Sequence, residues 1–340
     1  MIKRCNILST MSAALCAVLM AITFPACDGI IYDDLDPCSH GVSLRFVYDH
    51  NMEFANSFHQ QVDCLTLYIY DAQGNFVTKA VETTDALKDE NYRMQIDLDE
   101  GDYRIIAYGG LACEKHSFSV VEEPIPTRAA LDTDMQVVMN DGALGTQLHD
   151  LYYGDLKMTV EANGYVENTL YLMKNTNHLR IMLQQVDNRL PLDDTHFAFT
   201  ITDDNTRMDH NNDLVASGTV GYTPWAQGTV GVGTTEGSEG EEEAKVAYAE
   251  LSTARLVART QQAPRLVVMN KETDQEVINI PLINYLLLLK SERYAQMSAQ
   301  EFLDRESDWS LIFFLDEQGN WLRTQIVIND WIVRLNDAEL

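Results

Sequence analysis

Short runs of alternating apolar and polar residues, closed by turn residues, recur along most of the chain and limit what it can fold into. In the first of them, Val42, Leu44, Phe46 and Tyr48 alternate with Ser43, Arg45 and Asp49. Further runs with strand character are TLYLM, HLRIMLQQV, HFAFTITD, RLVVMN, EVINIPLI, WSLIFFLD and RTQIVINDWIVRL. A period of two places alternate side chains on one face of a strand, so half-buried strands are expected. Many short strands with regular turns predict an all-β chain of β-sandwiches.

Two similar hairpins suggest that the chain has two halves. Residues 67–77 (LYIYDAQGNFV) and 312–322 (IFFLDEQGNWL) share Asp, Gln, Gly and Asn within an apolar frame. Duplication of a domain and independent use of common turn chemistry both explain this similarity. In either case we expect a boundary between residues 155 and 165, which gives an N-terminal sandwich over 41–159 and a C-terminal one over 160–340. The clearest helix is SAQEFLDRE, where Ser298 and Glu301 have the spacing of a capping box.

The first 26 residues have the features of an export signal. Two basic residues precede an apolar run at 12–24, and the small residue Ala26 stands directly before Cys27. A membrane-spanning helix needs about 20 apolar residues, so this run is too short to span stably. The longest later apolar block, 285–289, has only the length of a strand. The sequence therefore predicts a signal peptide over 1–26 and an exported chain behind it.

A cysteine at the cleavage border is typical of a bacterial lipoprotein. Its thiol takes a diacylglycerol, the signal is cut in front of it, and the new amino group is acylated. We predict that Cys27 carries S-diacylglycerol and N-palmitoyl groups, that it anchors the chain in the outer membrane, and that residues 27–40 form a tether. Phe24 stands where such signals usually have Leu. Ordinary cleavage near Ala26, with Cys27 left as a free thiol, is the alternative.

The charge of the chain excludes some classes of partner. The signal contains two basic residues and no acid, so its removal leaves 52 acidic and 22 basic residues and a net charge of −30. Such a chain does not neutralise phosphates, so nucleic acid is not an expected partner.

Three cysteines besides Cys27 remain after signal removal, namely Cys38, Cys64 and Cys113. Outside the reducing cytoplasm, one disulfide and one free thiol are expected. Cys64 begins one predicted strand and Cys113 follows another, so we favour this pair, with Cys38 as the competing partner for either. None of these cysteines has the spacing of a zinc site, and no metal or cofactor is predicted.

Several segments between Cys27 and the C-terminus resemble one known family. They are CDGIIYDDLDPC, GVSLRFVYDHNMEFANSF, LYIYDAQGNFV, YRMQIDLDEGDYRIIAYGGL, LHDLYYGD and IVINDWIVR. In this order they are similar to the FimB/Mfa family of Bacteroidales fimbrial anchor lipoproteins, of the fimbrillin-like, type V pilus class. The resemblance implies two tandem transthyretin-like Greek-key β-sandwiches. It also implies a place at the base of a fimbrium, on the cell surface, with fimbrial stalk subunits as partners.

The resemblance also implies how the subunits meet. Fimbriae of this kind assemble by donor-strand exchange, and a trypsin-like protease first removes the lipid and first strand of each stalk subunit. This chain has no Lys or Arg from residue 28 to residue 44, and Arg45 lies inside the first predicted strand. We therefore expect it to keep its lipid. The C-terminal segment, 323–340, is the candidate donor strand; the alternative is that it forms the last strand of its own domain.

Motifs for chemistry are weak, so the chain is not predicted to be an enzyme. The DHNND run has Asp209, Asn211 and Asp213 at the opening spacing of a calcium loop, but the required Gly is Leu214, which favours a solvated turn. His116, His149 and Asp150 accompany no recognisable nucleophile, which argues against a hydrolase. Tyr152, Tyr153, Trp225, Trp309 and Trp321 are expected in sandwich cores rather than at a sugar site. A surface adhesin module that binds a glycan or a host ligand is the alternative function.

Overall fold

The computed structural model describes residues 41–126, 130–131, 135–162, 164–187, 192–234, 243–328 and 331–334. In the N-terminal half, seven strands are connected in the order β3-β2-β5-β8-β9-β1-β4. They are β1 (Gly41–Val47), β2 (Leu65–Asp71), β3 (Phe76–Glu82), β4 (Met94–Ile96), β5 (Gly101–Gly109), β8 (Tyr152–Val160) and β9 (Tyr165–Lys174).

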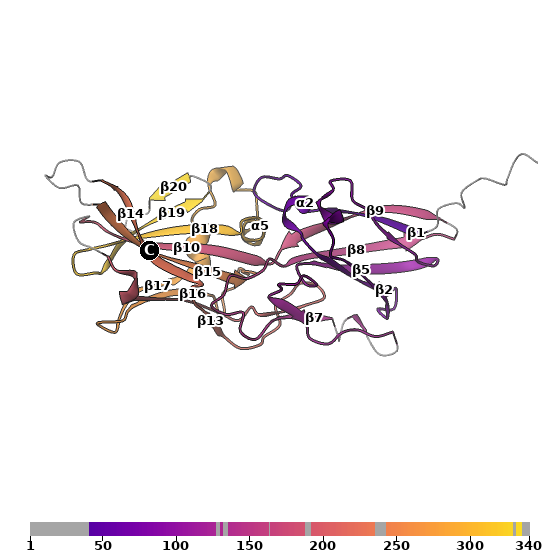
Figure 1. The fold of residues 1–340 in the computed structure, drawn as a ribbon, viewed down its shortest axis with the longest axis horizontal. Coiled ribbons are helices and arrows are strands. Elements are labelled where there is room, and N and C mark those ends of the chain that lie inside the picture. Colours follow the sequence, from indigo (N-terminus) through magenta and orange to yellow (C-terminus); the bar gives the residue numbers. More distant parts are fainter. Residues whose placement is uncertain are drawn as a thin grey trace, which may run out of the picture. The chain divides into compact units, whose positions relative to one another are not determined.

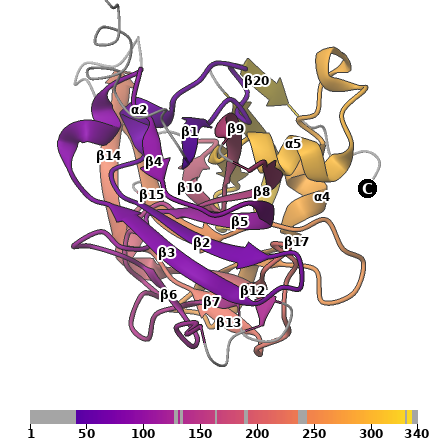
Figure 2. The same ribbon diagram turned by 90° about the vertical axis from the view of Figure 1, so that its right-hand side faces the viewer.

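These seven strands form two layers. β8 and β9 pair only where Tyr152–Gly154 meets Leu172–Lys174, so the sheet turns over at this point. Figure 2 shows β2, β3 and β5 as one layer and β1, β4 and β9 as the other. Leu44 of β1 and Ile69 of β2 belong to the same buried apolar cluster, which fills the space between the layers.

Two further sheets pack face to face in the C-terminal half (Figure 1). The six-stranded sheet has the order β14-β15-β10-β18-β19-β20, and the four-stranded sheet has the order β13-β11-β16-β17. Ile181 of β10 and Phe199 of β11 are buried in one cluster between them. Their strands are β10 (Thr176–Gln185), β11 (Phe197–Asp203), β13 (Val220–Tyr222), β14 (Ala226–Thr234), β15 (Glu243–Ala254), β16 (Arg265–Asn270), β17 (Gln275–Pro281), β18 (Asp308–Leu315), β19 (Trp321–Ile328) and β20 (Trp331–Arg334). The predicted fold class, an all-β chain of two transthyretin-like Greek-key sandwiches, is confirmed.

A small fourth sheet joins the two halves. It consists of β6 (Phe118–Val120), β7 (Gln136–Met139) and β12 (Arg207–Asp209), in the order β12-β7-β6. Tyr68 and Tyr108, on the face of β2 and β5 that points away from the N-terminal core, share the larger buried cluster with C-terminal residues such as Ile201. The outer face of this layer is therefore covered, and the two halves share a core.

Each half contains a parallel pair of strands that are far apart in sequence. β1 runs parallel to β9, and β10 runs parallel to β18. β8 and β9 both belong to the seven-stranded sheet, so β9, which lies after the predicted limit, pairs with strands of the N-terminal half. The domain limits stay a prediction, and the sheet order favours a boundary between β9 and β10.

The helices are short. The predicted SAQEFLDRE helix is confirmed as α5 (Ala299–Arg305), where the Ser298 Oγ accepts the Glu301 N–H at 3.0 Å. The apolar block at 285–289 is not a strand, because its first part lies in α4 (Leu282–Leu287). The structure also describes the short helix α2 (Phe58–Gln61) and the 3-10 turns η1 (Asp85–Lys88), η2 (Asp194–His196) and η3 (Glu292–Tyr294).

The turns of the two similar hairpins have the same hydrogen bonds. The Asp71 Oδ1 accepts the N–H groups of Gln73 at 2.9 Å and of Asn75 at 2.8 Å. In the second turn, the Asp316 carboxylate accepts the corresponding N–H groups of Gln318 and Asn320 at 3.0 and 2.7 Å. Gly74 and Gly319 have φ of 79° and 81°, a region that favours glycine.

These hairpins nevertheless occupy different places in their halves. β18 is the parallel partner of β10, and the strand with that role in the N-terminal half is β9 rather than β2. Common turn chemistry therefore explains the similarity better than duplication does.

Buried and half-buried charged side chains gather where β8, β9, β10 and β18 approach one another. The Asp150 carboxylate lies 3.0 Å from the Lys174 Nζ and 3.1 Å from the His178 Nε2, and it accepts a bond from the Thr176 hydroxyl. Burial alone would raise the pKa of Asp150, but the bond from His178 and the charge of Lys174 hold it well below its usual range. Asp150 therefore contributes stability above about pH 4, and that stability is lost as the pH falls further.

The pKa of Glu306, which precedes β18, is shifted in the opposite direction to that of Asp150. Burial raises its pKa from 4.5 to about 7, so the folded state binds a proton that the unfolded state has already released. Stability therefore falls as the pH rises from about 4.5 to 7. We expect Glu306→Gln to be more stable than the parent at pH 8 by up to roughly 3 kcal/mol and similar to it at pH 4.5. Gln retains the oxygen that accepts the Ser307 and Asp308 N–H groups.

Urea unfolding at both pH values measures this difference. Glu301→Gln is the matched control, because Glu301 makes a partly exposed ion pair with Arg305 that contributes little. An equal effect of Glu306→Gln at both pH values would show that burial of the charge is not the cause.

Candidate functional site

The first strand of the N-terminal sandwich is held on both sides. β1 pairs with β9 from Gly41↔Tyr165 to Val47↔Tyr171, and with β4 from Val42↔Ile96 to Leu44↔Met94. The side chains of Val42 and Leu44 are fully buried, and that of Phe46 is nearly so. The alternation that identified this strand in the sequence thus directs its apolar residues into the core.

Arg45 is the one basic residue of β1, and its side chain is exposed. Its backbone lies opposite Thr169 in the parallel pair with β9. A protease needs several extended residues free of other pairing, so cleavage after Arg45 requires β1 to leave its sheet first. Loss of β1 would uncover the apolar groove between β9 and β4.

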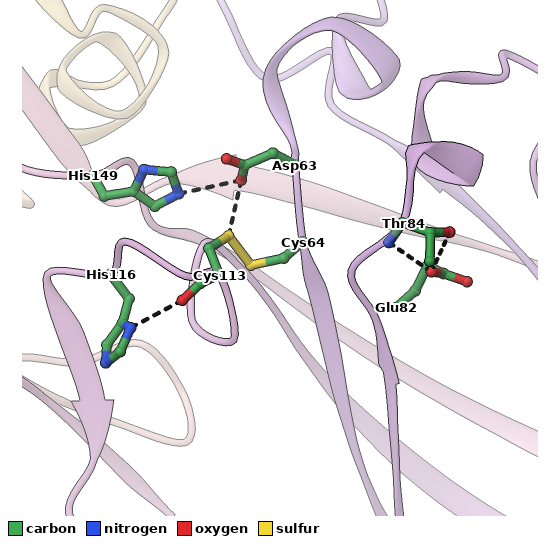
Figure 3. The surroundings of a disulfide bond; sticks show 7 residues. All are labelled: Asp63, Cys64, Glu82, Thr84, Cys113, His116 and His149. Atoms are coloured by element: carbon green, nitrogen blue, oxygen red, sulfur yellow. Dashed lines mark hydrogen bonds and ion pairs between the residues drawn. A yellow bond between two sulfur atoms is a disulfide. The ribbon is translucent and has the colours of Figure 1, made fainter.

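A disulfide joins Cys64 and Cys113, with their Cα atoms 5.4 Å apart (Figure 3). Cys64 directly precedes β2 and Cys113 follows β5, and these two strands pair with Leu65 opposite Gly109. This is the pairing that the sequence favoured over the alternatives with Cys38. Cys38 and the predicted lipid site, Cys27, lie outside the described residues.

Polar side chains surround the sulfur atoms (Figure 3). The Asp63 Oδ1 lies 2.9 Å from the Cys113 Sγ and 3.2 Å from the His149 Nε2. A disulfide sulfur carries no hydrogen, so the first distance is a contact and not a donated bond. Asp63, Cys64 and Cys113 are also the one group of potential metal ligands within the described ranges. Because both sulfurs are bonded to each other, neither is a thiolate ligand.

We expect loss of this disulfide to destabilise the N-terminal sandwich. The bond closes a loop with a sequence separation of 49, and such cross-links contribute about 2–4 kcal/mol. Cys64→Ser combined with Cys113→Ser should lower the free energy of unfolding by that amount in chemical denaturation. Cys38→Ser is the control and should leave it unchanged. An equal loss in the control would show that Cys38 takes part in the bond.

The C-terminal segment forms the end of its own sheet. β19 pairs with β18, and β20 pairs with β19 from Gln325↔Arg334 to Ile328↔Trp331. Within the described part of the chain, β20 has one neighbour, so it is an edge strand. β19 and β20 thus have the arrangement of the alternative that the sequence left open, in which this segment belongs to its own domain.

The DHNND run forms a hydrogen-bonded turn. The Asp209 Oδ1 accepts the N–H groups of Asn211 and Asp213 at 2.8 and 3.0 Å. The Asn211 Oδ1 accepts a bond from Arg104 at 2.8 Å. Asp209 therefore uses its carboxylate for the turn, and Asn211 connects the turn to β5.

Most of the aromatic candidates lie in the cores. Tyr152, Tyr153 and Trp309 are buried, and Trp321 packs against Phe313 with ring centroids 5.8 Å apart. Trp225 is 37% exposed.

The histidines that the sequence singled out lie apart from one another. His149 pairs with Asp63, and Asp150 pairs with Lys174 and His178, so the sequence neighbours His149 and Asp150 have separate partners. His116 contacts the carbonyl of Cys113. Among the helices that the structure describes, none is long and apolar enough to cross a membrane.

Comparison with known families identifies the protein family of this chain. The sequence model of the fimbrillin-A associated anchor proteins Mfa1 and Mfa2 matches residues 35–337. The chain belongs to this family. Family membership associates it with fimbriae at the cell surface, in an anchor or adhesin type of role, and gives no indication of catalysis. A comparison with curated proteins found no match.

Solved structures agree with this assignment. A candidate adhesin of Bacteroides thetaiotaomicron is 52% identical, with a TM-score of 0.81 over 89% of this chain and 100% of its own. A candidate polysaccharide-binding protein of the same species is 26% identical, with a TM-score of 0.74 over 88% of this chain and 99% of its own. The fimbrial anchor protein Mfa2 of Porphyromonas gingivalis shares the fold, at 17% identity and a TM-score of 0.64 over 87% of this chain and 99% of its own.

Proposed function

We propose that this protein is an outer-membrane lipoprotein that attaches a fimbrium to the cell surface. Acyl groups on Cys27 hold the chain in the membrane, residues 27–40 act as the tether, and fimbrial stalk subunits are the partners. The family supports the association with fimbriae. The observation that carries the proposal is the closed first strand, because an anchor has to keep the covalent link between its lipid and its folded part.

The pairing of β1 supports this retention. β1 has neighbours on both sides and buries Val42, Leu44 and Phe46, so its removal would break two rows of backbone hydrogen bonds and open the core. The segment before Arg45 contains no basic residue after the signal. A trypsin-like protease therefore meets no accessible site between the lipid and the sandwich.

Mass spectrometry of the mature protein from its own membrane tests the proposal. We expect the first residue to be Cys27, with acyl groups on its sulfur and its amino group. A mature chain that begins at Phe46 instead would place this protein among subunits that are processed for polymerisation.

We also propose that the contact with the stalk is of the donor-strand type and involves the β19–β20 end of the six-stranded sheet. β20 pairs with one neighbour over four residues, so little pairing has to be broken before a stalk strand replaces it or before it adds to a stalk sheet. Each backbone hydrogen bond contributes about 0.5–1.5 kcal/mol, so a longer partner strand would more than offset the loss.

A further inference from the structure

β9 and β10 follow one another along the chain and connect the two halves. β9 ends at Lys174 and β10 begins at Thr176, so Asn175 alone separates them. Figure 1 shows β10 continuing from β9 in nearly the same direction. β9 belongs to the N-terminal sheet and β10 to the six-stranded sheet of the C-terminal half. A pulling force on one half therefore reaches the other along a short and direct stretch of backbone.

The joint between these two strands is fixed by hydrogen bonds. Asn175 is fully buried, and its N–H donates to the Leu151 carbonyl at 2.7 Å. Its side-chain amide exchanges two bonds with the amide of Asn212, at 2.7 and 3.0 Å. Directly before it, Lys174 makes an ion pair with Asp150 at 3.0 Å. Because these contacts hold the joint, β9 and β10 keep their relative direction when the chain is pulled.

In the N-terminal half, β1 is the strand that a pull on the tether would load. β1 begins at Gly41 and runs parallel to β9, with Gly41 opposite Tyr165 and Val47 opposite Tyr171. Tension from the tether enters β1 at Gly41 and leaves β9 at its other end, at Lys174. In a parallel pair these two ends point away from each other. The force therefore acts along both strands in opposite directions, which is a shear.

β10 and β18 repeat this arrangement in the C-terminal half. They pair in parallel from His178↔Asp308 to Gln185↔Leu315. Tension enters β10 at Thr176, where the joint ends. A stalk held at the β19–β20 end draws it out of β18 at Leu315, where the turn to β19 follows. The second parallel pair is therefore sheared by the same force as the first.

Paired strands resist shear better than peeling. The hydrogen bonds lie across the strands, so a force along the strands loads all of them together, whereas a force across the strands breaks them one after another. Both end strands also have a second neighbour, because β1 pairs with β4 and β18 pairs with β19. Sliding would move buried side chains such as Leu44 and Leu311 out of their places in close-packed cores.

We propose that the pairs β1–β9 and β10–β18 are two shear clamps in series, which carry the tension between the membrane and a fimbrium while the chain stays folded. The inference rests on the proposed function for the two ends at which the force acts. The segments that connect β1 to β9 and β10 to β18 are bridged by the clamps, so neither segment is stretched while the clamps hold.

Single-molecule force spectroscopy on the mature chain without its lipid tests the inference. One handle is fused in front of residue 28, and the other is coupled to an introduced thiol in a Cys38→Ser background. Glu317→Cys, at an exposed position in the turn after β18, shears both clamps. Tyr165→Cys, opposite Gly41, makes the same N-terminal handle peel β1 from β9. We expect the shearing geometry to need a rupture force at least about twofold higher at equal pulling speed, because its hydrogen bonds have to break together.

A third chain loads the second clamp by itself. It carries Tyr171→Cys, at an exposed position of β9, together with Glu317→Cys, and is pulled by these two thiols. Its rupture force should also exceed that of the peeling geometry. Urea unfolding should give all three chains the same free energy of unfolding, so that only the direction of the force differs between them.

Equal rupture forces in the shearing and peeling geometries would overturn the inference. A force as low as that of peeling in the third chain would overturn the second clamp. The purified chain carries neither lipid nor stalk, so these results leave the proposed attachment untouched. That attachment is tested separately by the first residue of the mature protein.

Discussion

Cells that produce Cys27→Ser should release this protein from their membranes. The acyl transfer needs a thiol, and a serine hydroxyl at the same place does not replace it. Each methylene of an acyl chain that enters the bilayer contributes about 0.8 kcal/mol, so loss of several chains removes lasting attachment. We expect the variant in the soluble fraction or as an uncleaved precursor, and not in the membrane.

Metabolic labelling with a fatty acid, followed by membrane fractionation, measures both parts of this result. Cys38→Ser is the matched control, since it removes a cysteine from the same N-terminal region without touching the cleavage border. Labelling of Cys27→Ser at the level of the parent would contradict the prediction. If the chain anchors a fimbrium, fimbriae should appear in the medium of Cys27→Ser cells and stay on Cys38→Ser cells.

The alternation of side chains was enough to predict the fold class. In β11 and β18, every second residue is buried, as the runs HFAFTITD and WSLIFFLD indicate. The Ser298 cap also gave the correct start of α5, because a capping box is a local signal. Local signals of this kind identify a strand or helix, but they do not indicate which other elements it packs against.

The arrangement of the elements depends on contacts that no local pattern contains. β1 and β9 are parallel partners although Gly41 and Tyr165 are far apart in the chain. Residues 65–70 of β2 are buried on both faces, since the small sheet of β6, β7 and β12 covers the second face. β9, which begins at Tyr165, likewise pairs with β1 and β8, and no local pattern in the sequence indicates these partners.

In the candidate site, too, some features could be predicted from local sequence signals and others could not. The favoured pair of Cys64 and Cys113 depended only on strand ends, and β2 and β5 are neighbours. The charged group of Asp150, Lys174 and His178 had no signal of this kind, because its members come from a loop and two strands whose proximity is tertiary.

Stepwise truncation of the C-terminus should separate fimbrial attachment from folding. We expect deletion of 329–340, which removes β20, to lower stability by about 1–3 kcal/mol, because a few edge hydrogen bonds are lost. The remaining chain should still unfold cooperatively, yet fimbriae should detach into the medium. Deletion of 323–340 should be far more damaging. It removes most of β19 and leaves β18, with its fully buried Leu311 and Phe313, at the edge of the sheet.

Deletion of 335–340 is the control in this series, because it keeps β20 and should retain both stability and fimbriae. Denaturant unfolding reports the first property, and the amount of fimbrial protein in the culture medium reports the second. If cells with the 329–340 deletion keep their fimbriae while the protein folds, the β19–β20 end is not the stalk contact. Detached fimbriae in that variant, together with a cooperative unfolding transition, would show that the edge strand is needed for attachment and not for the fold. If β20 were needed only for the fold, its deletion would not release fimbriae from a protein that still folds.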